Sequence, residues 1–119
     1  KGIFYRKDRV KKLETSLKKI SITTKLGWCD DPKSKKYNQL IRYPSKYRSE
    51  RLHRKDNIYD IVIVLNYNMN PIRKNKGSAI FIHIAKENYK STEGCIAVKK
   101  NNLLKIVKDL KKNTKIKII

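Results

Sequence analysis

The sequence has few of the residues that usually mark a metal site, a membrane span or a secretion signal. Its 119 residues include two cysteines and two histidines. They show no CxxC or HxxxH spacing, so we do not expect a structural zinc site. No apolar run approaches the roughly 20 residues that cross a bilayer, and the opening residues lack the apolar stretch of a signal peptide. Because the chain begins with Lys1 instead of Met, we expect a processed or truncated fragment that lacks its N-terminal portion.

Acidic residues are scarce as well. The chain has 10 Asp and Glu against 31 Lys and Arg, a net charge of +21, which predicts attraction to polyanions such as nucleic acid, anionic lipid or an acidic wall polymer. Tyr37, Tyr43 and Tyr47 interleave with basic residues, as an RNA-stacking surface would. The lysines are nevertheless spread over the whole chain instead of forming one block, and no RNA-binding motif accompanies them. We therefore expect no nucleic-acid partner.

The apolar residues occur mostly as short β-branched runs, which predict strands. Residues 59–65 give the strongest signal, a continuous run typical of a strand buried in the core. Residues 78–84 predict a second core strand, with His83 at its end. Shorter extended elements are expected at residues 2–5, 17–24, 95–98 and 115–119.

One helix is expected near the C-terminus, where Asn101 is a candidate N-cap. The residues after it are spaced to give this helix one apolar face, formed by Leu103, Leu104, Ile106, Val107 and Leu110. Residues 27–57, by contrast, predict a long irregular stretch with turns, which in a compact domain is usually functional or misassigned. Together these patterns predict a single, mainly β domain over residues 1–119 with one C-terminal helix.

A histidine at the end of a core strand and a later Gly-Cys pair form the one constellation with obvious chemical potential. A thiol becomes a good nucleophile when a neighbouring base takes its proton, and the end of a rigid strand is a good place to hold that base. Gly94 before Cys95 permits a tight turn, which leaves the Cys95 N–H able to face a developing oxyanion. From residue types alone, however, a lone cysteine is more often a small core residue, and Cys29 and Cys95 also fit a plain disulfide.

A family resemblance changes that balance. His83 followed by Thr92-Glu93-Gly94-Cys95-Ile96 resembles the His…[Ser/Thr]-x-Gly-Cys signature of the L,D-transpeptidase (YkuD-domain) family. Further stretches in the same order also resemble a branch of that family: the opening Lys1-Gly2-Ile3-Phe4, Gly27-Trp28-Cys29-Asp30-Asp31-Pro32 with Tyr37-Asn38, residues 59–65, and residues 77–83. The resemblance is spread over nearly the whole chain and implies a β-sandwich or partly closed barrel of mixed strands.

The resemblance also implies a mechanism and a substrate. Cys95 would be the nucleophile and His83 the general base, with the main-chain carbonyl of Ile84 orienting the imidazole and with Thr92 and Gly94 helping to shape the oxyanion site. Family members attack the bond between meso-diaminopimelate and D-alanine in a peptidoglycan tetrapeptide stem and release D-alanine. An amine of a second stem then resolves the thioester and forms a cross-link. This chemistry requires no metal and no organic cofactor.

Three departures from the family pattern concern substrate contacts. Glu93 stands where the family usually has His, Ala97 stands where it often has Arg, and the loop after His83 is short. We expect the stem carboxylates to be bound by Arg42, Arg73 or Lys99, from charge alone. Trp28 is either a wall of the substrate cleft or, more simply, a buried anchor of the long irregular stretch.

The expected function is therefore cysteine-dependent transfer on peptidoglycan stem peptides, in the periplasm or cell envelope. Attraction of the basic chain to anionic wall or membrane surfaces would assist it. Two alternatives remain open from the sequence. The same site with water as acceptor would make an L,D-carboxypeptidase, and loss of activity would leave a basic module that binds wall polymer or nucleic acid.

Overall fold

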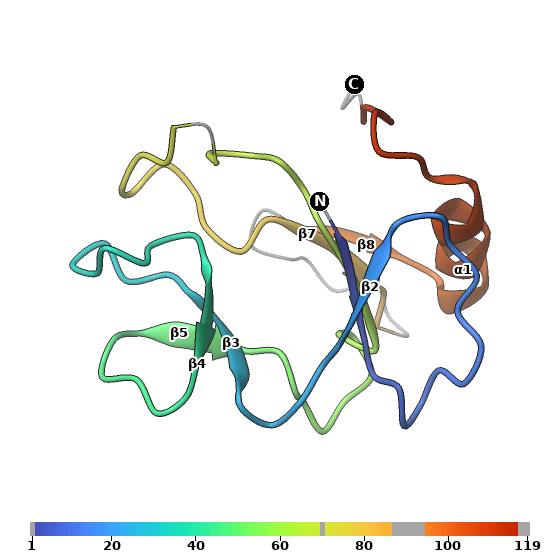
Figure 1. Cartoon of the computed structure of the whole chain (residues 1–119), viewed down its shortest axis with the longest axis horizontal. Helices are drawn as coiled ribbons and strands as arrows, with labels where there is room; N and C mark the ends of the chain where they lie inside the picture. The colour runs from blue at the N-terminus through green and yellow to red at the C-terminus, as the bar shows by residue number, and fades with distance from the viewer. Residues whose placement is uncertain (1, 70, 87–94, 117–119) are drawn as a thin grey trace.

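The computed structural model describes residues 2–69, 71–86 and 95–116, which form two β-sheets and one α-helix (Figure 1). The larger sheet has the strand order β2-β1-β6-β7-β8, with bounds Lys18–Ser21, Gly2–Tyr5, Ile61–Val64, Phe81–Ile84 and Ile96–Val98. The smaller sheet has the order β4-β3-β5, with bounds Leu40–Arg42, Leu26–Cys29 and Ser49–Arg51. The helix α1 spans Lys100–Asp109. No helix in the described ranges is long and apolar enough to cross a membrane.

The large sheet is mixed, and its central strands are buried on both faces. β1 and β7 run antiparallel to β6, whereas β2 and β8 run parallel to β1 and β7. Successive side chains of a strand point to opposite faces, so Ile61 and Ile63 contribute to one hydrophobic cluster while Val62 and Val64 contribute to the other. Burial on both faces explains why the sequence of β6 is a continuous apolar run instead of an alternating one.

Different elements cover the two faces of the large sheet. Leu103 and Val107 of α1 are fully buried in one cluster. On the opposite face, Trp28 of β3 packs edge-on against Phe81 of β7, with ring centroids 5.5 Å apart, and against Phe4 of β1 at 6.5 Å. The small sheet and the helix therefore lie on opposite sides of the large sheet, as Figure 1 shows. The predicted mainly β fold with one C-terminal helix is confirmed, and the two sheets form a sandwich, with no closed barrel among the described residues.

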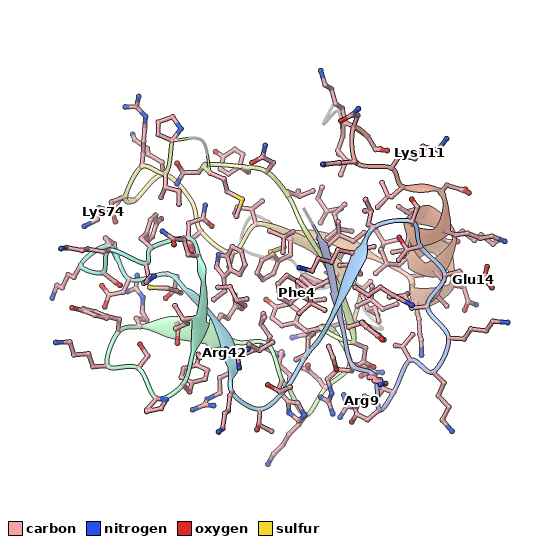
Figure 2. The ribbon with its side chains drawn as sticks, viewed as in Figure 1. Phe4, Arg9, Glu14, Arg42, Lys74 and Lys111 are labelled. Atoms are coloured by element: carbon pink, nitrogen blue, oxygen red, sulfur yellow. The ribbon has the colours of Figure 1, made fainter. Side chains whose placement is uncertain are left out.

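Basic residues lie at well-separated places on the molecule. Figure 2 places Phe4 in the middle of the molecule, whereas Lys74 and Lys111 lie at opposite ends of it. This arrangement agrees with the even spread of lysines along the chain. A net charge of +21 attracts polyanions in general.

The prediction of an irregular stretch over residues 27–57 was wrong, because all or most of three short strands, β3, β4 and β5, lie within it. β4 and β5 have three residues each and carry polar side chains, so neither produces a hydrophobic period. Their pairing with β3, at Gly27–Ile41 and Trp28–Glu50, is a tertiary interaction. Local sequence patterns do not reveal such pairing.

Other predicted boundaries also shift. β2 covers four residues of the expected 17–24, and β7 begins at Phe81 instead of residue 78. α1 begins at Lys100 with Lys99 at the N-cap position and without a side-chain cap, so the prediction that Asn101 caps the helix was wrong. Thr24, Lys115 and Ile116 are not in strands, and residues 117–119 of the expected last strand lie outside the described residues.

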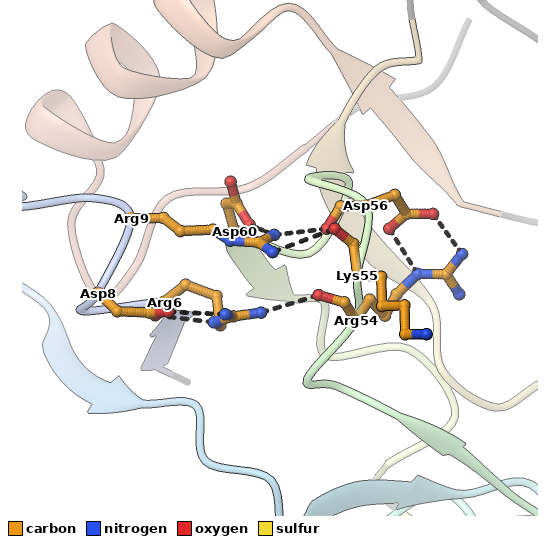
Figure 3. A network of polar contacts seen from close by, with 7 residues as sticks. All are labelled: Arg6, Asp8, Arg9, Arg54, Lys55, Asp56 and Asp60. Atoms are coloured by element: carbon orange, nitrogen blue, oxygen red, sulfur yellow. Dashed lines mark hydrogen bonds and ion pairs between the residues drawn. The ribbon is translucent and has the colours of Figure 1, made fainter.

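A polar network ties the segment after β1 to the segment before β6 (Figure 3). The buried Arg6 donates to both carboxylate oxygens of Asp8, at 2.8 and 2.7 Å, and to the carbonyl of Arg54 at 2.8 Å. Arg9 donates to the carbonyls of Lys55 and Asp56 at 3.1 and 2.7 Å and forms an ion pair with Asp60 at 3.0 Å. Bidentate and charge-assisted contacts of this kind fix geometry well. The network therefore holds residues 54–60 in place beside the large sheet.

Candidate active site

His83 is in β7, and Cys95 lies directly before the neighbouring strand β8. β7 and β8 are parallel, with Ile82 opposite Ile96 and His83 opposite Ala97. When this register is extended by one residue toward the N-terminus, Cys95 lies opposite Phe81. Cys95 also packs against the hydrophobic cluster that contains Phe81. Ideal strand geometry then places the Cα atoms of His83 and Cys95 about 8 Å apart on the diagonal. A thiol and an imidazole span that separation when they point toward each other.

The imidazole of His83 is buried and oriented by its own backbone. Its Nδ1 lies 3.0 Å from the carbonyl oxygen of Ile84, and the residue is only 4% exposed. A carbonyl only accepts hydrogen bonds, so Nδ1 carries a proton, and in the neutral ring the lone pair is then on Nε2. This is the contact with Ile84 that the resemblance led us to expect. It leaves the ring in the tautomer that a general base requires.

The Cys95 thiol donates a hydrogen bond to the carbonyl oxygen of Ala79 at 3.1 Å. Ala79 has a φ of +56°, a left-handed conformation that is uncommon for a residue other than glycine. Such strain persists only where the surrounding structure holds it. It also explains why β7 begins after residue 79 instead of at residue 78.

Asn38 forms hydrogen bonds with the backbone at Ala79 and with the loop after β6. It is 2% exposed, and its side-chain oxygen accepts from the Trp28 indole N–H at 3.0 Å and from the Ala79 N–H at 3.4 Å. Its amide nitrogen donates to the carbonyls of Tyr67 and Asn68 at 3.1 and 2.8 Å. One buried amide thus links the small sheet, the loop after β6 and the backbone that receives the Cys95 thiol.

Replacing Asn38 by alanine is expected to destabilise the fold by about 2–4 kcal/mol, because buried donors and acceptors lose their partners. Asn38 also has a φ of +57°, which alanine adopts less readily than asparagine. Asn38→Gly is the matched control, since it loses the same hydrogen bonds without the backbone cost and should be less damaging by up to about 1 kcal/mol. Urea unfolding followed by the fluorescence of Trp28, the one tryptophan, measures both. Equal stability of the alanine variant and the parent would contradict the role of Asn38.

Burial raises the pKa of the half-buried Cys95 thiol above its ordinary value. A hydrogen bond with the backbone of Phe81 lowers this pKa, and the negative charge of Glu50 raises it. The raised pKa keeps the thiol protonated at neutral pH. The resting nucleophile is therefore a neutral thiol and not a preformed thiolate. A base must remove the proton as the sulfur attacks.

The alkylation of Cys95 by iodoacetamide should accordingly rise with pH and reach its midpoint above 9.0, the ordinary value for a cysteine. Because the raised pKa favours the protonated form, the rate at pH 7 should be lower than that of an unstructured cysteine peptide. Peptide mass spectrometry at a series of pH values separates Cys95 from the buried Cys29. A midpoint well below 9.0 would instead indicate a thiolate stabilised by His83.

Two residues that the sequence did not single out lie beside this pair. Tyr59 packs edge-on against the His83 ring, with centroids 5.5 Å apart, and against Phe81 at 5.7 Å. Its hydroxyl donates to Oε1 of Glu50 at 2.7 Å. Burial and the Glu50 carboxylate both raise the pKa of Tyr59, so its hydroxyl stays protonated. Tyr59 opened a predicted core strand and Glu50 lay in the predicted irregular stretch, so no local signal pointed to either.

The remaining predicted site residues are dispersed. Trp28 is 4% exposed and packs in the core, which is the buried-anchor interpretation of that residue. Arg42 is exposed on β4, Arg73 is exposed in the segment between β6 and β7, and Lys99 is exposed at the start of α1. Their contacts with substrate stay predictions. Thr92, Glu93 and Gly94 lie outside the described residues.

The two cysteines are both described, and neither forms a disulfide. Cys29 is 1% exposed on β3, where its backbone pairs with Gln39, Asn38 and Ser78, so it is a packed thiol. Asp31 accepts from the backbone N–H groups of Lys33 and Arg48, at 3.0 and 3.1 Å, as a turn former does. Within the described ranges no three His, Cys, Asp or Glu side chains gather in a way that would hold a metal ion.

Comparison with known proteins identifies the family of the chain. Residues 7–118 match the family described as YkuD, L,D-transpeptidase catalytic domain. The match covers nearly the whole chain and includes both His83 and Cys95. No curated protein and no solved structure gives a significant match.

Proposed function

This chain belongs to the L,D-transpeptidase catalytic-domain (YkuD) family, whose activity is directed at peptidoglycan, and from that premise we propose that it is a cysteine-dependent L,D-transpeptidase. In the proposed reaction Cys95 forms a thioester with a tetrapeptide stem, D-alanine leaves, and an acceptor amine takes over the acyl group. We also propose that residues 1–119 form one catalytic domain and that it works in the periplasm or cell envelope, where its substrate is found.

The observation that supports the proposal is the placement of His83 on β7 and of Cys95 directly before the neighbouring β8, with Nδ1 of His83 held by the Ile84 carbonyl. In the acylation step, the Cys95 thiol turns from the Ala79 carbonyl toward Nε2 of His83 and gives it a proton. The sulfur attacks the carbonyl carbon between diaminopimelate and D-alanine and forms a C–S bond. The C–N bond breaks, and His83 returns the proton to the departing D-alanine nitrogen.

The negative charge on the carbonyl oxygen during attack needs donors aimed at it. We propose that the backbone N–H of Cys95 supplies one donor and that Gly94 and Thr92 shape the approach. Arg42, Arg73 and Lys99 are proposed contacts for the stem carboxylates. Trp28 would act on the substrate only indirectly, by supporting Phe81 beneath the site.

Product analysis with purified tetrapeptide muropeptides tests the proposal. Transfer yields a cross-linked dimer together with free D-alanine, whereas an L,D-carboxypeptidase yields a tripeptide muropeptide and D-alanine without any dimer. The Cys95→Ala variant serves as the control and should yield neither product. A wall-binding module without activity is the outcome if the parent chain binds sacculi but releases no D-alanine.

A further inference from the structure

Glu50 stands on the face of the small sheet that points toward the large one. It lies directly opposite Trp28 in the antiparallel pairing of β5 with β3. Opposed residues of antiparallel strands project to the same face, and Trp28 packs against Phe81 of β7. The side chains of His83 and Cys95 come from that same face of the large sheet. Glu50 therefore approaches the nucleophile and base from the other side of the sandwich.

Among the residues that the structure describes, no ion pair involves the Glu50 carboxylate. Its hydrogen-bond partner among them is the neutral Tyr59 hydroxyl, at 2.7 Å. The charge of Arg54 acts on Glu50, but both oxygens of Asp56 bind that guanidinium, at 2.8 and 2.7 Å. This is unusual in a chain with a net charge of +21, because a half-buried carboxylate without a cation retains much of its desolvation cost. A cationic ligand would offset that cost.

The position of Glu50 relates it to the second half of the reaction. Its partner Tyr59 contacts the His83 ring at a centroid distance of 5.5 Å, so the carboxylate lies one side chain away from the base. The group that resolves a thioester by transfer is an amine, which is an ammonium at neutral pH before it reacts. Water carries no charge, and a carboxylate at this place would distinguish the two acceptors.

We propose that Glu50 binds the ammonium group of the acceptor stem and thereby selects an amine over water as the group that resolves the thioester. The inference rests on the proposed function and adds the acceptor contact to it. Glu50 is a specificity-determining residue in this account. Tyr59 is a positioning residue, because it acts by holding the carboxylate.

The proton balance of the step is complete with these groups. The acceptor ammonium gives one proton to the Glu50 carboxylate, from which it passes to solvent, and the resulting amine attacks the thioester carbonyl carbon. A C–N bond forms while the C–S bond breaks. The second proton of the nitrogen passes through His83 to the Cys95 sulfur, which returns to the thiol. The products are an amide cross-link, a neutral Cys95 and one released proton.

The test makes two measurements on each of four proteins: the parent chain, Glu50→Gln, Glu50→Asp and the control Glu14→Gln. Gln keeps the shape and still accepts from Tyr59, so the fold should persist. Glu14 pairs with Lys108 at 3.7 Å on the helix side of the molecule, so its substitution removes the same charge elsewhere. The first measurement is the rate of acylation by a carbapenem. The second is the ratio of cross-linked dimer to tripeptide, with the tetrapeptide muropeptide as both donor and acceptor.

For Glu50→Gln we expect the ratio of dimer to tripeptide to fall about tenfold, as for the loss of one charged hydrogen bond. Acylation and D-alanine release should not fall, because removal of the Glu50 charge takes away one of the influences that raise the pKa of Cys95. Glu50→Asp should lie between Gln and the parent, and Glu14→Gln should match the parent. An unchanged ratio in Glu50→Gln would overturn this inference alone. Equal losses of acylation and transfer would overturn it too, because Glu50 would then act on His83. A parent chain that releases no D-alanine would instead overturn the proposed function.

Discussion

Replacement of His83 by glutamine should lower the rate of acylation by about 10³-fold, in the range that a positioned general base contributes. The reason lies in the raised pKa of Cys95, which leaves little thiolate at neutral pH without a base. Glutamine approximates the size of the imidazole and can still donate to the Ile84 carbonyl. The fall in acylation rate should therefore come from the missing base and not from a change in the structure of the site. Stopped-flow or discontinuous measurement of carbapenem acylation gives the rate.

The pH dependence distinguishes a lost base from a disturbed fold. In the His83→Gln variant the residual rate should rise about tenfold per pH unit below the pKa of Cys95, because hydroxide then generates the thiolate. His53→Gln is the matched control, since His53 is the second histidine and lies in the segment between β5 and β6. It should react like the parent. A His83→Gln variant within threefold of the parent would contradict the assignment of the base.

Removal of the Cys95 thiol should abolish dimer formation and D-alanine release, with a loss of at least about 10⁴-fold. Cys95→Ser should be nearly as inactive as Cys95→Ala, because a hydroxyl is far harder to deprotonate than a thiol. A single imidazole that can deprotonate a thiol is too weak a base for a hydroxyl. Muropeptide chromatography measures the products. The effect on stability should be small, since Cys95 is only half-buried at the edge of its cluster.

Cys29→Ala is the control for this prediction. Cys29 is 1% exposed and belongs to the small sheet, whereas β8 belongs to the large one. Removal of its thiol should leave a cavity that costs about 1–2 kcal/mol of unfolding free energy. The catalytic rate of the folded protein should not change. Persistence of D-alanine release in Cys95→Ala would show that another group is the nucleophile.

The central strands and the helix could be predicted because their residues carry a local signal. β6 is a continuous apolar run, and the apolar spacing of α1 matches one helical face. The placement of His83 in β7 and of Cys95 directly before β8 could likewise be anticipated, since both residues stand beside short apolar runs. The Ile84 contact followed from the family resemblance, and not from periodicity.

The small sheet could not be predicted, because its strands are held by pairing between segments far apart in sequence. β4 and β5 are too short and too polar to show a period of two. Glu50 likewise carries no signal in the sequence, since only its pairing with Trp28 in the small sheet shows that it faces inward. The left-handed conformation of Ala79 also has no signal in the sequence, because alanine normally avoids it. The Ala79 N–H donates to Asn38, a residue 41 positions earlier in the chain.

The most direct test of the account is intact-protein mass spectrometry after incubation with a carbapenem, for the parent chain and for Cys95→Ala. Carbapenems acylate the cysteine of this family and need no correct stem peptide, so they test the nucleophile by itself. The account predicts one covalent adduct per parent chain, on the peptide that contains Cys95, and none on the variant. A folded parent chain without an adduct, or an adduct that persists in Cys95→Ala, would contradict it.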